Sequence, residues 1–547
     1  MISQHSLWRK TLLSGLILFA VAAITACNSS SNSTKTPSVL SAQDSIATVS
    51  VVDTSGLPVT GASVTFNGTA LDIEGKEITE ALTTDETGLI AFYSSVGANV
   101  KILASKAGYL TTGTEMTISD GANNKILTMV VFQDGATVNG IAMGEQNVTT
   151  SGGTTTGPVE VTLNNTTDGN VSVSQKITIP AGTVMKTADG QPATGTVHVQ
   201  ATNFTADAVE AFPGGMSVVA AGVPNTVTNT TSTQAVDFVS AGFTAIQMTD
   251  DDGKSIKSFE NNPITIEMLV PIGSLNPETG NPIAIGDIIP IWSYEETTGE
   301  WSYEGQGEVL ANDATTYKIV YEASHLSYWN LDWYGGERCR PAYVDIADLS
   351  QGTEVITSLK VKARGLHREV FDYAGDGSYE LNNIPRNLPV TLTLYYDGEK
   401  RDSTTVTFSD TGCQAALHVG TVVPKTPVRV RVVEECRNGS KQNPIPSASI
   451  IMQTAGGAWT ATGVSTGLDG VAGILIAPDQ NTNIRVYMYG TDRYTSTFSS
   501  VNIKAGETQD QTIVFTLGSK YDDYCNGGAT GATGGTGGTG GTGGTNL

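Results

Sequence analysis

Residues 463–467 carry the spacing of a serine nucleophile. The pentapeptide reads Gly-Val-Ser-Thr-Gly, with Ser465 between two glycines. Such a serine attacks a carbonyl only where a strand turns sharply into a helix, which lifts the hydroxyl toward a histidine and an acidic partner. Residues 468–473 read Leu-Asp-Gly-Val-Ala-Gly, and the two glycines make this stretch a poor helix former. We therefore expect a turn here and no catalysis at Ser465.

Three consecutive aspartates, at residues 250–252, precede Gly253. Calcium needs six to eight oxygen ligands, and carboxylates supply them. The spacing does not match an EF-hand loop, and we expect strands on both sides, so a solvated hairpin turn is the favoured interpretation. The five histidines are scattered, and the chain contains none of the common zinc, phosphate or dinucleotide motifs. We expect no metal, no cofactor and no enzymatic activity.

Aromatic residues concentrate in one part of the chain. Four of the six tryptophans lie between residues 292 and 333. Trp292 and Tyr294 stand before a turn at residues 296–299, and Trp301 and Tyr303 stand after it. Residues two apart on a strand share a face, so the four rings could form one surface. An exposed surface could stack on sugar rings, whereas an inward one would be core, and the inward orientation is favoured because aromatic pairs hold hairpins together.

The overall composition indicates strands and turns. Charged residues make up 15% of the 547 residues, below the fraction of about 25% in typical soluble domains. The formal net charge is -24, which repels phosphate backbones and anionic lipid headgroups. We therefore expect no nucleic-acid partner. The chain is too long for one core and predicts three to five folded units.

The amino terminus predicts export. Two basic residues at positions 9–10 precede an apolar stretch, residues 12–23, which suits a signal peptide better than a membrane span. The following Ile-Thr-Ala-Cys, residues 24–27, resembles the lipobox of bacterial lipoproteins. That resemblance implies removal of residues 1–26 and attachment of lipid to Cys27, so that acyl chains hold the protein on a membrane.

The residues after Cys27 predict an unfolded tether and a cellular location. Residues 27–44 are rich in Ser, Thr and Asn and should remain unfolded. By resemblance to enteric sorting rules, Asn28 favours the outer membrane of a Gram-negative bacterium. The sequence leaves open whether the protein faces the periplasm or the medium.

Internal repeats predict a series of β-sandwiches. Residues 53–66 read D-T-S-G-L-P-V-T-G-A-S-V-T-F and are followed by T-T-D-E-T-G at residues 83–88. This order resembles the carboxypeptidase regulatory-like domains, which are transthyretin-like β-sandwiches, over residues 45–133. Residues 425–525 repeat the pattern, and residues 337–424 resemble a divergent copy without the P-V-x-G-A element. The resemblance implies an all-β fold of tandem Ig-like or transthyretin-like sandwiches.

The remaining segments complete the expected organisation. Residues 134–336 predict a larger central β-rich domain, with a strand at residues 264–271. Residues 526–547 repeat Gly at every third position from Gly528 but contain no Pro, so a flexible tail is favoured over a collagen-like trimer.

The four cysteines after Cys27 predict disulfides. They are even in number and would lie in an oxidising compartment. Three pairings are possible. We favour Cys339 with Cys413 and Cys436 with Cys525, because each pair then brackets one predicted domain.

Together these observations predict a non-enzymatic, lipid-anchored envelope protein that acts as a stalk, an adhesin or a structural module. Its expected partners are the membrane, through the lipid on Cys27, and other envelope proteins or surface glycans. An alternative is a carbohydrate-binding accessory lipoprotein that uses the aromatic residues of the central domain. The least favoured function is a hydrolase with an unrecognised site in residues 134–336.

Overall fold

The computed structural model describes residues 44–526 apart from short segments. The expected signal peptide, Cys27, nearly all of the tether and the Gly-rich tail after residue 526 lie outside the described residues. The internal segments left out are 73–74, 121–122, 168, 226–227, 348–356, 373–377, 397–398, 409–411, 419–425, 446–447, 455–458, 468, 477–480, 489–497 and 504–509.

The first sandwich lies between residues 44 and 129 and consists of two sheets around one core. Its strands are β1 (Asp44–Asp53), β2 (Ser63–Asn67), β3 (Leu82–Thr83), β4 (Leu89–Ser95), β5 (Asn99–Ser105), β6 (Thr112–Thr117) and β7 (Asn123–Met129). One sheet has the order β4-β1-β7 and the other β3-β2-β5-β6. Residues 47–51 alternate between apolar and polar types, which predicts a half-buried strand with one solvated face, and this prediction is wrong. Residues 45–51 are all buried, because Val49 packs in the sandwich core while Ile46 packs in a second cluster.

The central unit lies between residues 137 and 333. A twelve-stranded sheet and a five-stranded sheet, in the order β11-β12-β19-β23-β22, enclose its largest core. A six-residue 3-10 helix, η1, is an element that the sequence did not indicate. The elements are β8 (Thr137–Val138), β9 (Ile141–Ser151), β10 (Thr154–Thr155), β11 (Val159–Thr166), β12 (Ser172–Ile179), β13 (Val184–Thr187), β14 (Thr196–Thr205), η1 (Ala206–Ala211), β15 (Ser217–Asn225), β16 (Thr230–Asp237), β17 (Val239–Thr249), β18 (Ile256–Glu260), β19 (Ile264–Pro271), β20 (Ile288–Glu295), β21 (Glu300–Glu308), β22 (Leu310–Ala311), β23 (Thr316–Ala323) and β24 (Tyr328–Trp333).

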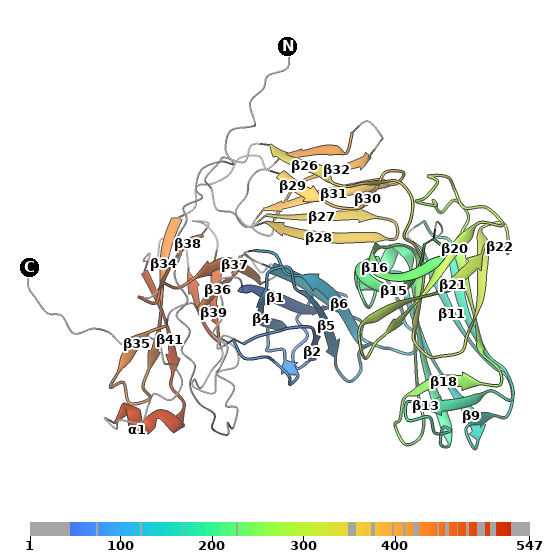
Figure 1. Ribbon diagram of the computed structural model, residues 1–547, viewed down its shortest axis with the longest axis horizontal. Coiled ribbons are helices and arrows are strands. Elements are labelled where there is room, and N and C mark those ends of the chain that lie inside the picture. Colours follow the sequence, from blue (N-terminus) through green and yellow to red (C-terminus); the bar gives the residue numbers. More distant parts are fainter. Residues whose placement is uncertain are drawn as a thin grey trace, which may run out of the picture. The chain divides into compact units, whose positions relative to one another are not determined.

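The third sandwich lies between residues 338 and 418 and has its own core. Its strands are β25 (Arg338–Cys339), β26 (Ala342–Ala347), β27 (Thr357–Ala363), β28 (Leu366–Asp372), β29 (Ser378–Leu381), β30 (Ile384–Pro385), β31 (Pro389–Tyr396), β32 (Glu399–Thr407) and β33 (Gln414–His418). One sheet has the order β29-β26-β33. The other has the order β28-β27-β31-β32, and its strands lie side by side in Figure 1.

The fourth sandwich lies between residues 426 and 525, around a fourth core. Its elements are β34 (Thr426–Glu435), β35 (Gln442–Pro444), β36 (Ser449–Thr454), β37 (Thr460–Ser465), β38 (Val471–Ile476), β39 (Thr482–Tyr487), β40 (Phe498–Ile503), β41 (Asp510–Thr516), η2 (Ser519–Tyr521) and α1 (Asp522–Cys525). β34 pairs with β35, β38 and β41, and the second sheet has the order β37-β36-β39-β40. Figure 1 shows β34 and β41 together, with α1 at their end.

The three small sandwiches share one topology. In each, the first long strand (β1, β26 or β34), called the first strand below, pairs antiparallel with β4, β29 or β38 and parallel with the last strand (β7, β33 or β41). The other sheet follows an equivalent order in all three. The third sandwich, whose sequence is the most divergent, therefore has the same framework as the other two. The expected all-β class with tandem sandwiches is confirmed. None of the helices in the described part of the chain has the length and apolar character that a membrane span requires.

Candidate functional site

The pairing of the first and last strands is the feature that the three small sandwiches have in common. β1 and β7 pair in parallel from Ala47 with Asn123 to Asp53 with Met129. β26 pairs in the same way with β33, and β34 with β41. Because parallel strands point in one direction, the chain enters a sandwich at the start of the first strand and leaves at the far end of the last. Seven paired residues in the first and fourth sandwiches separate the entry from the exit by roughly 20 Å, and five paired residues in the third separate them by roughly 13 Å.

Two disulfides bracket the third and fourth sandwiches. Cys339 joins Cys413, with Cα atoms 5.7 Å apart, and Cys436 joins Cys525, with Cα atoms 5.6 Å apart. The favoured pairing is therefore confirmed. Cys413 directly precedes β33, and Cys436 directly follows β34. Each disulfide thus lies beside the parallel pair of first and last strands.

The aromatic residues expected on a hairpin do lie on one. Tyr294 in β20 pairs with Trp301 in β21, and Trp292 pairs with Tyr303, across a turn in which the Gly299 amide donates to the Glu295 carbonyl at 2.8 Å. This register brings the two aromatic pairs together across the hairpin.

These rings do not form an exposed face. Trp292, Tyr294 and Trp301 are at most 2% exposed and belong to one core cluster, against which Tyr303 is partly buried. The Trp301 indole Nε1 donates to the Gly214 carbonyl oxygen at 3.2 Å. Burial raises the pKa of the Tyr294 hydroxyl, so that group is neutral at physiological pH. The inward orientation is the one that the structure contains, and the rings offer sugars no stacking surface.

Ser465 stands at the end of a strand that leads into another strand. β37 ends at Ser465, and β38 begins at Val471 after a turn in which the Gly470 amide donates to the Gly467 carbonyl at 2.9 Å. A nucleophile elbow needs a helix at that point. Instead, Thr466 is buried and ties the turn to the preceding loop. The arrangement is that of a structural turn.

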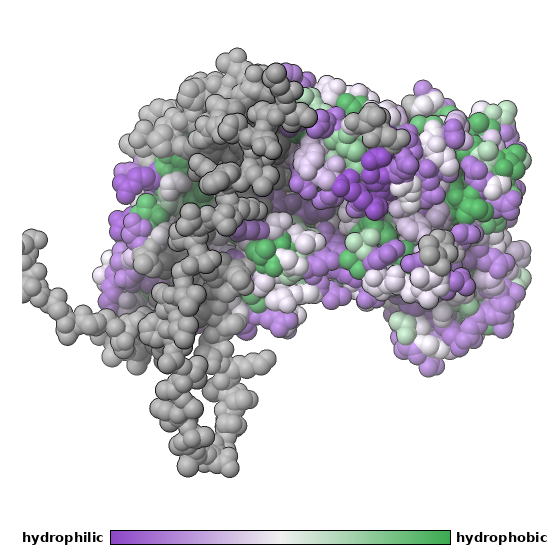
Figure 2. Space-filling model, turned by 45° about the horizontal axis from the view of Figure 1, so that its top comes forward, coloured by the Kyte–Doolittle hydropathy of each residue, from purple (hydrophilic) through white to green (hydrophobic). Residues whose placement is uncertain are grey.

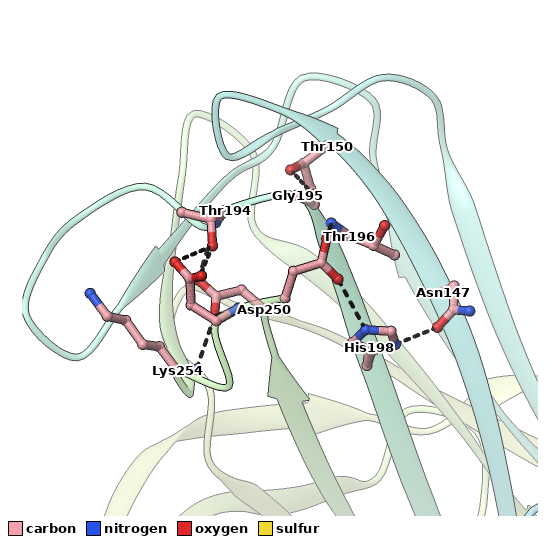
Figure 3. A network of polar contacts seen from close by, with 10 residues as sticks. Asn147, Thr150, Thr194, Gly195, Thr196, His198, Asp250 and Lys254 are labelled. Atoms are coloured by element: carbon pink, nitrogen blue, oxygen red, sulfur yellow. Dashed lines mark hydrogen bonds and ion pairs between the residues drawn. The ribbon is translucent and has the colours of Figure 1, made fainter.

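The aspartate turn differs in one respect from the expected solvated hairpin. Figure 3 shows Asp250 held between Thr194 and Lys254. The Asp250 carboxylate is 3% exposed and accepts four hydrogen bonds. Burial raises the pKa of Asp250 and the four hydrogen bonds lower it, with the net result that the pKa lies below its ordinary value. Asp251 and Asp252 are exposed as expected, so the turn is built on one buried acceptor.

Asp251 completes the polar network of that turn without assembling a metal site. Its carboxylate accepts a hydrogen bond from the Thr196 amide at 2.8 Å and lies 3.3 Å from His198 Nε2. The other ring nitrogen of His198 lies 2.8 Å from Asn147 Oδ1 (Figure 3). Within the described residues, no three His, Cys, Asp or Glu side chains come together as a metal ion would require.

A buried polar chain that the sequence did not indicate links β17 and β24 of the central unit. The Ser240 hydroxyl donates to Asn330 Oδ1 at 2.8 Å, and the Asn330 amide donates to Asp332. Burial raises the pKa of Asp332 well above its ordinary value. All three residues are at most 3% exposed, so the chain is inaccessible to a substrate. Its signal in the sequence is the pair of polar residues inside the otherwise apolar strand β24.

A buried cation connects the fourth sandwich with the first. Arg485 in β39 is 7% exposed and forms ion pairs with Asp85 and Glu86. Its guanidinium also lies over the Trp459 ring, 4.6 Å from the centroid. Burying this cation is favourable only with such partners, since an unpaired charge would lose its hydration without compensation.

The exposed surface is mixed in character. On the face shown in Figure 2, hydrophobic residues form separate small groups among hydrophilic ones. Among the described residues, the most exposed large apolar side chains are Leu57, at 62%, and Ile285, at 61%. Apolar residues exposed singly are ordinary in soluble proteins.

No family model matches this chain, and no curated protein is similar to it. Among solved structures, it is similar to the minor pilin of Streptococcus agalactiae, at 11% identity over 33% of this chain and 96% of that one, with a TM-score of 0.18. It is also similar to the major pilin subunit of Bacillus cereus, at 9% identity over 87% of this chain and 99% of that one, with a TM-score of 0.14. At these scores the similarity assigns neither a family nor a function.

Proposed function

We propose that the protein is a non-enzymatic, lipid-anchored component of a bacterial cell envelope that acts as a surface stalk, an adhesin or a structural module. The observation that carries this proposal is the parallel pairing of first and last strands in three sandwiches of equal topology. A chain that enters each sandwich at one end and leaves at the other is suited to bridging a distance. Three repetitions of that arrangement suit a spacer.

The lipid anchor rests on the sequence at residues 24–28, and the location in the outer membrane rests on Asn28. Acyl chains on Cys27 would hold the protein, with each buried methylene contributing about 0.8 kcal/mol. The segment after Cys27 would separate the first sandwich from the membrane. We also propose that the three small sandwiches belong to the carboxypeptidase regulatory-like superfamily, which their common topology supports.

A non-enzymatic role is supported by the placement of the residues that could have done chemistry. Ser465 precedes a turn between strands, and the Ser240–Asn330–Asp332 chain is inaccessible. A carbohydrate-binding role through Trp292 and Trp301 loses its support, because both rings are buried. Other envelope proteins are therefore the partners that we propose.

Metabolic labelling and protease shaving test the proposal. Cells that express the protein are fed an alkyne fatty acid, and we expect label in the wild type and none in Cys27→Ala. Protease added to intact cells should remove the sandwiches from the wild type. Label in the Cys27→Ala protein would contradict the anchor, and complete protection until the envelope is broken would contradict surface display.

A further inference from the structure

In the third sandwich, the disulfide between Cys339 and Cys413 can transmit mechanical tension through covalent bonds, so that most of the folded sandwich carries no load. The chain reaches Cys339 before β26 begins, and Cys413 lies immediately before β33, the last strand. Tension that enters before Cys339 and leaves after His418 therefore follows the disulfide and β33. Residues 340–412 lie inside the closed loop and carry none of it. β33 is already an extended strand, so the route gains almost no length.

The fourth sandwich has an equivalent route at the opposite end of its strand pair. Tension that enters at β34 reaches Cys436 directly after the strand, crosses to Cys525 and leaves toward the tail. Both cysteines are buried in a small cluster with Leu517, which fixes α1 beside the strand pair. β34 is also extended already, and residues 437–524 lie inside the loop.

The first sandwich and the central unit contain no cysteine. In the first sandwich, tension between the two ends pulls β1 and β7 in opposite directions along their length. Their seven parallel pairs, from Ala47 with Asn123 to Asp53 with Met129, then resist together, whereas pairs at the mouth of a hairpin would open one after another. The contact of Arg485 with Asp85 must open before the segments between the sandwiches are stretched.

We propose that the protein carries mechanical tension between its membrane anchor and its carboxyl-terminal tail, with the third and fourth sandwiches made inextensible by their disulfides. This proposal rests on the proposed function, because the lipid anchor on Cys27 defines the end of the chain at which force is applied. Among the folded units, only the first sandwich and the central unit can lengthen by unfolding. The two disulfides act as covalent links in the force path, in addition to stabilising their folds.

Single-molecule stretching of the chain from Asn28 to Leu547, held by tags at both ends, tests the route. Under oxidising conditions we expect no lengthening from residues 340–412 or 437–524. Reductant should add two length increments, of roughly 26 nm and roughly 31 nm, from sequence separations of 74 and 89 residues at about 3.6 Å per residue. Traces that contain both increments before reduction, or neither after it, would overturn the proposal.

Cysteine variants test each disulfide separately, and a core variant tests whether a loss of stability alone produces the same lengthening. Cys339→Ala with Cys413→Ala should release only the shorter increment, and Cys436→Ala with Cys525→Ala only the longer one. Val430→Ala removes buried side-chain volume from the fourth core without touching a disulfide. It should lower the melting temperature yet reveal no increment. Because the wild type is reduced while it is held, the test does not depend on the folding of the cysteine variants.

A flow experiment distinguishes failure of this inference from failure of the proposed function. Cells that display the protein with a carboxyl-terminal epitope are captured on an antibody-coated surface, and chymotrypsin is added with and without flow. We expect flow to speed the release of cells that carry all four Cys→Ala changes several-fold more than that of wild-type cells. Equal release under flow would overturn the inference. Failure of the antibody to capture cells at rest would contradict surface display and leave the stretching result to decide the mechanics.

Discussion

Thr84 and Thr466 make the same two hydrogen bonds in two different sandwiches. The Thr84 hydroxyl accepts a bond from the Ala62 amide at 2.8 Å and donates one to the Val59 carbonyl at 2.6 Å. The Thr466 hydroxyl accepts from the Ala448 amide at 2.9 Å and donates to the Ile445 carbonyl at 2.6 Å. Both threonines are buried. The repeated motif thus preserves an internal tie between a turn and the preceding loop.

Thr84→Val should weaken the first sandwich by about 1–3 kcal/mol. Valine has nearly the same shape but leaves the Ala62 amide and the Val59 carbonyl buried without their partner, and an unmade buried bond costs its desolvation. Hydrogen exchange at the Ala62 amide, measured by mass spectrometry, should accelerate. Thr60→Val is the matched control, because Thr60 is exposed and should change exchange very little. Equal effects of the two variants would remove the role assigned to Thr84.

Gly88→Ala should destabilise the first sandwich far more than Gly56→Ala. Both glycines have positive φ, at 68° and 78°, so each substitution costs about 1–2 kcal/mol in backbone strain. A Cβ at Gly88 would also lie 2.3 Å from the Val51 carbonyl oxygen, whereas one at Gly56 meets nothing within 4 Å. Urea denaturation of the two variants should therefore differ by several kcal/mol, and a difference near zero would mean that β1 moves away freely.

The sequence predicted the hairpin of β20 and β21 and favoured its inward aromatic face, but it did not predict which segments pack against a strand. The pairing of Tyr294 with Trp301 follows from alternation and from the turn between them, which are local. Which face is buried depends on what packs against the hairpin, and that comes from distant segments: Leu103 and Leu110 belong to the same cluster. The solvated face expected for β1 was wrong for the same reason, since Ile46 clusters with Ile451 and Trp459.

Among the candidate site features, the disulfide pairing could be predicted from the sequence, whereas the buried role of Asp250 could not. The disulfide pairing followed from the order of the predicted domains, because each pair encloses one folding unit. The buried role of Asp250 was not visible, since Asp in a turn is usually solvated and two of its four hydrogen-bond donors come from Thr194, far away in sequence. The parallel pairing of first and last strands also depends on contacts between residues far apart in the chain.

Trp301→Ala should destabilise the central unit, and any loss of binding should be a consequence of that destabilisation. Removing a large buried ring costs about 3–5 kcal/mol, and here it also leaves the Gly214 carbonyl without its donor. Thermal denaturation followed by tryptophan fluorescence should show the loss. Tyr343→Ala, at a ring that is 43% exposed, is the control and should have a small effect. A stable Trp301→Ala protein that selectively loses binding on a glycan array would restore the carbohydrate hypothesis.

Asp250 should contribute to acid sensitivity of the central unit. Because the pKa of this carboxyl is lower in the folded state than in the unfolded chain, its stabilisation is fully present above the unfolded pKa. It is lost as the pH falls through the folded value, in the range below about pH 4. Asp250→Asn should cost about 1–3 kcal/mol at neutral pH and flatten the acid limb of the stability curve. An unchanged acid limb would mean that the four hydrogen bonds contribute nothing to the ionised form.

Reduction of the disulfides should weaken two sandwiches and leave the first unaffected. In the chain-entropy model, loops with sequence separations of 74 and 89 residues each contribute about 4.5 kcal/mol by restricting the unfolded chain. Hydrogen exchange with and without reductant measures each sandwich in one sample. The first sandwich is an internal control because it has no cysteine. Faster exchange confined to the third and fourth sandwiches is expected, since each loop closes within one of them, whereas equal acceleration in the first sandwich would mean that its stability depends on contacts such as Arg485 with Asp85.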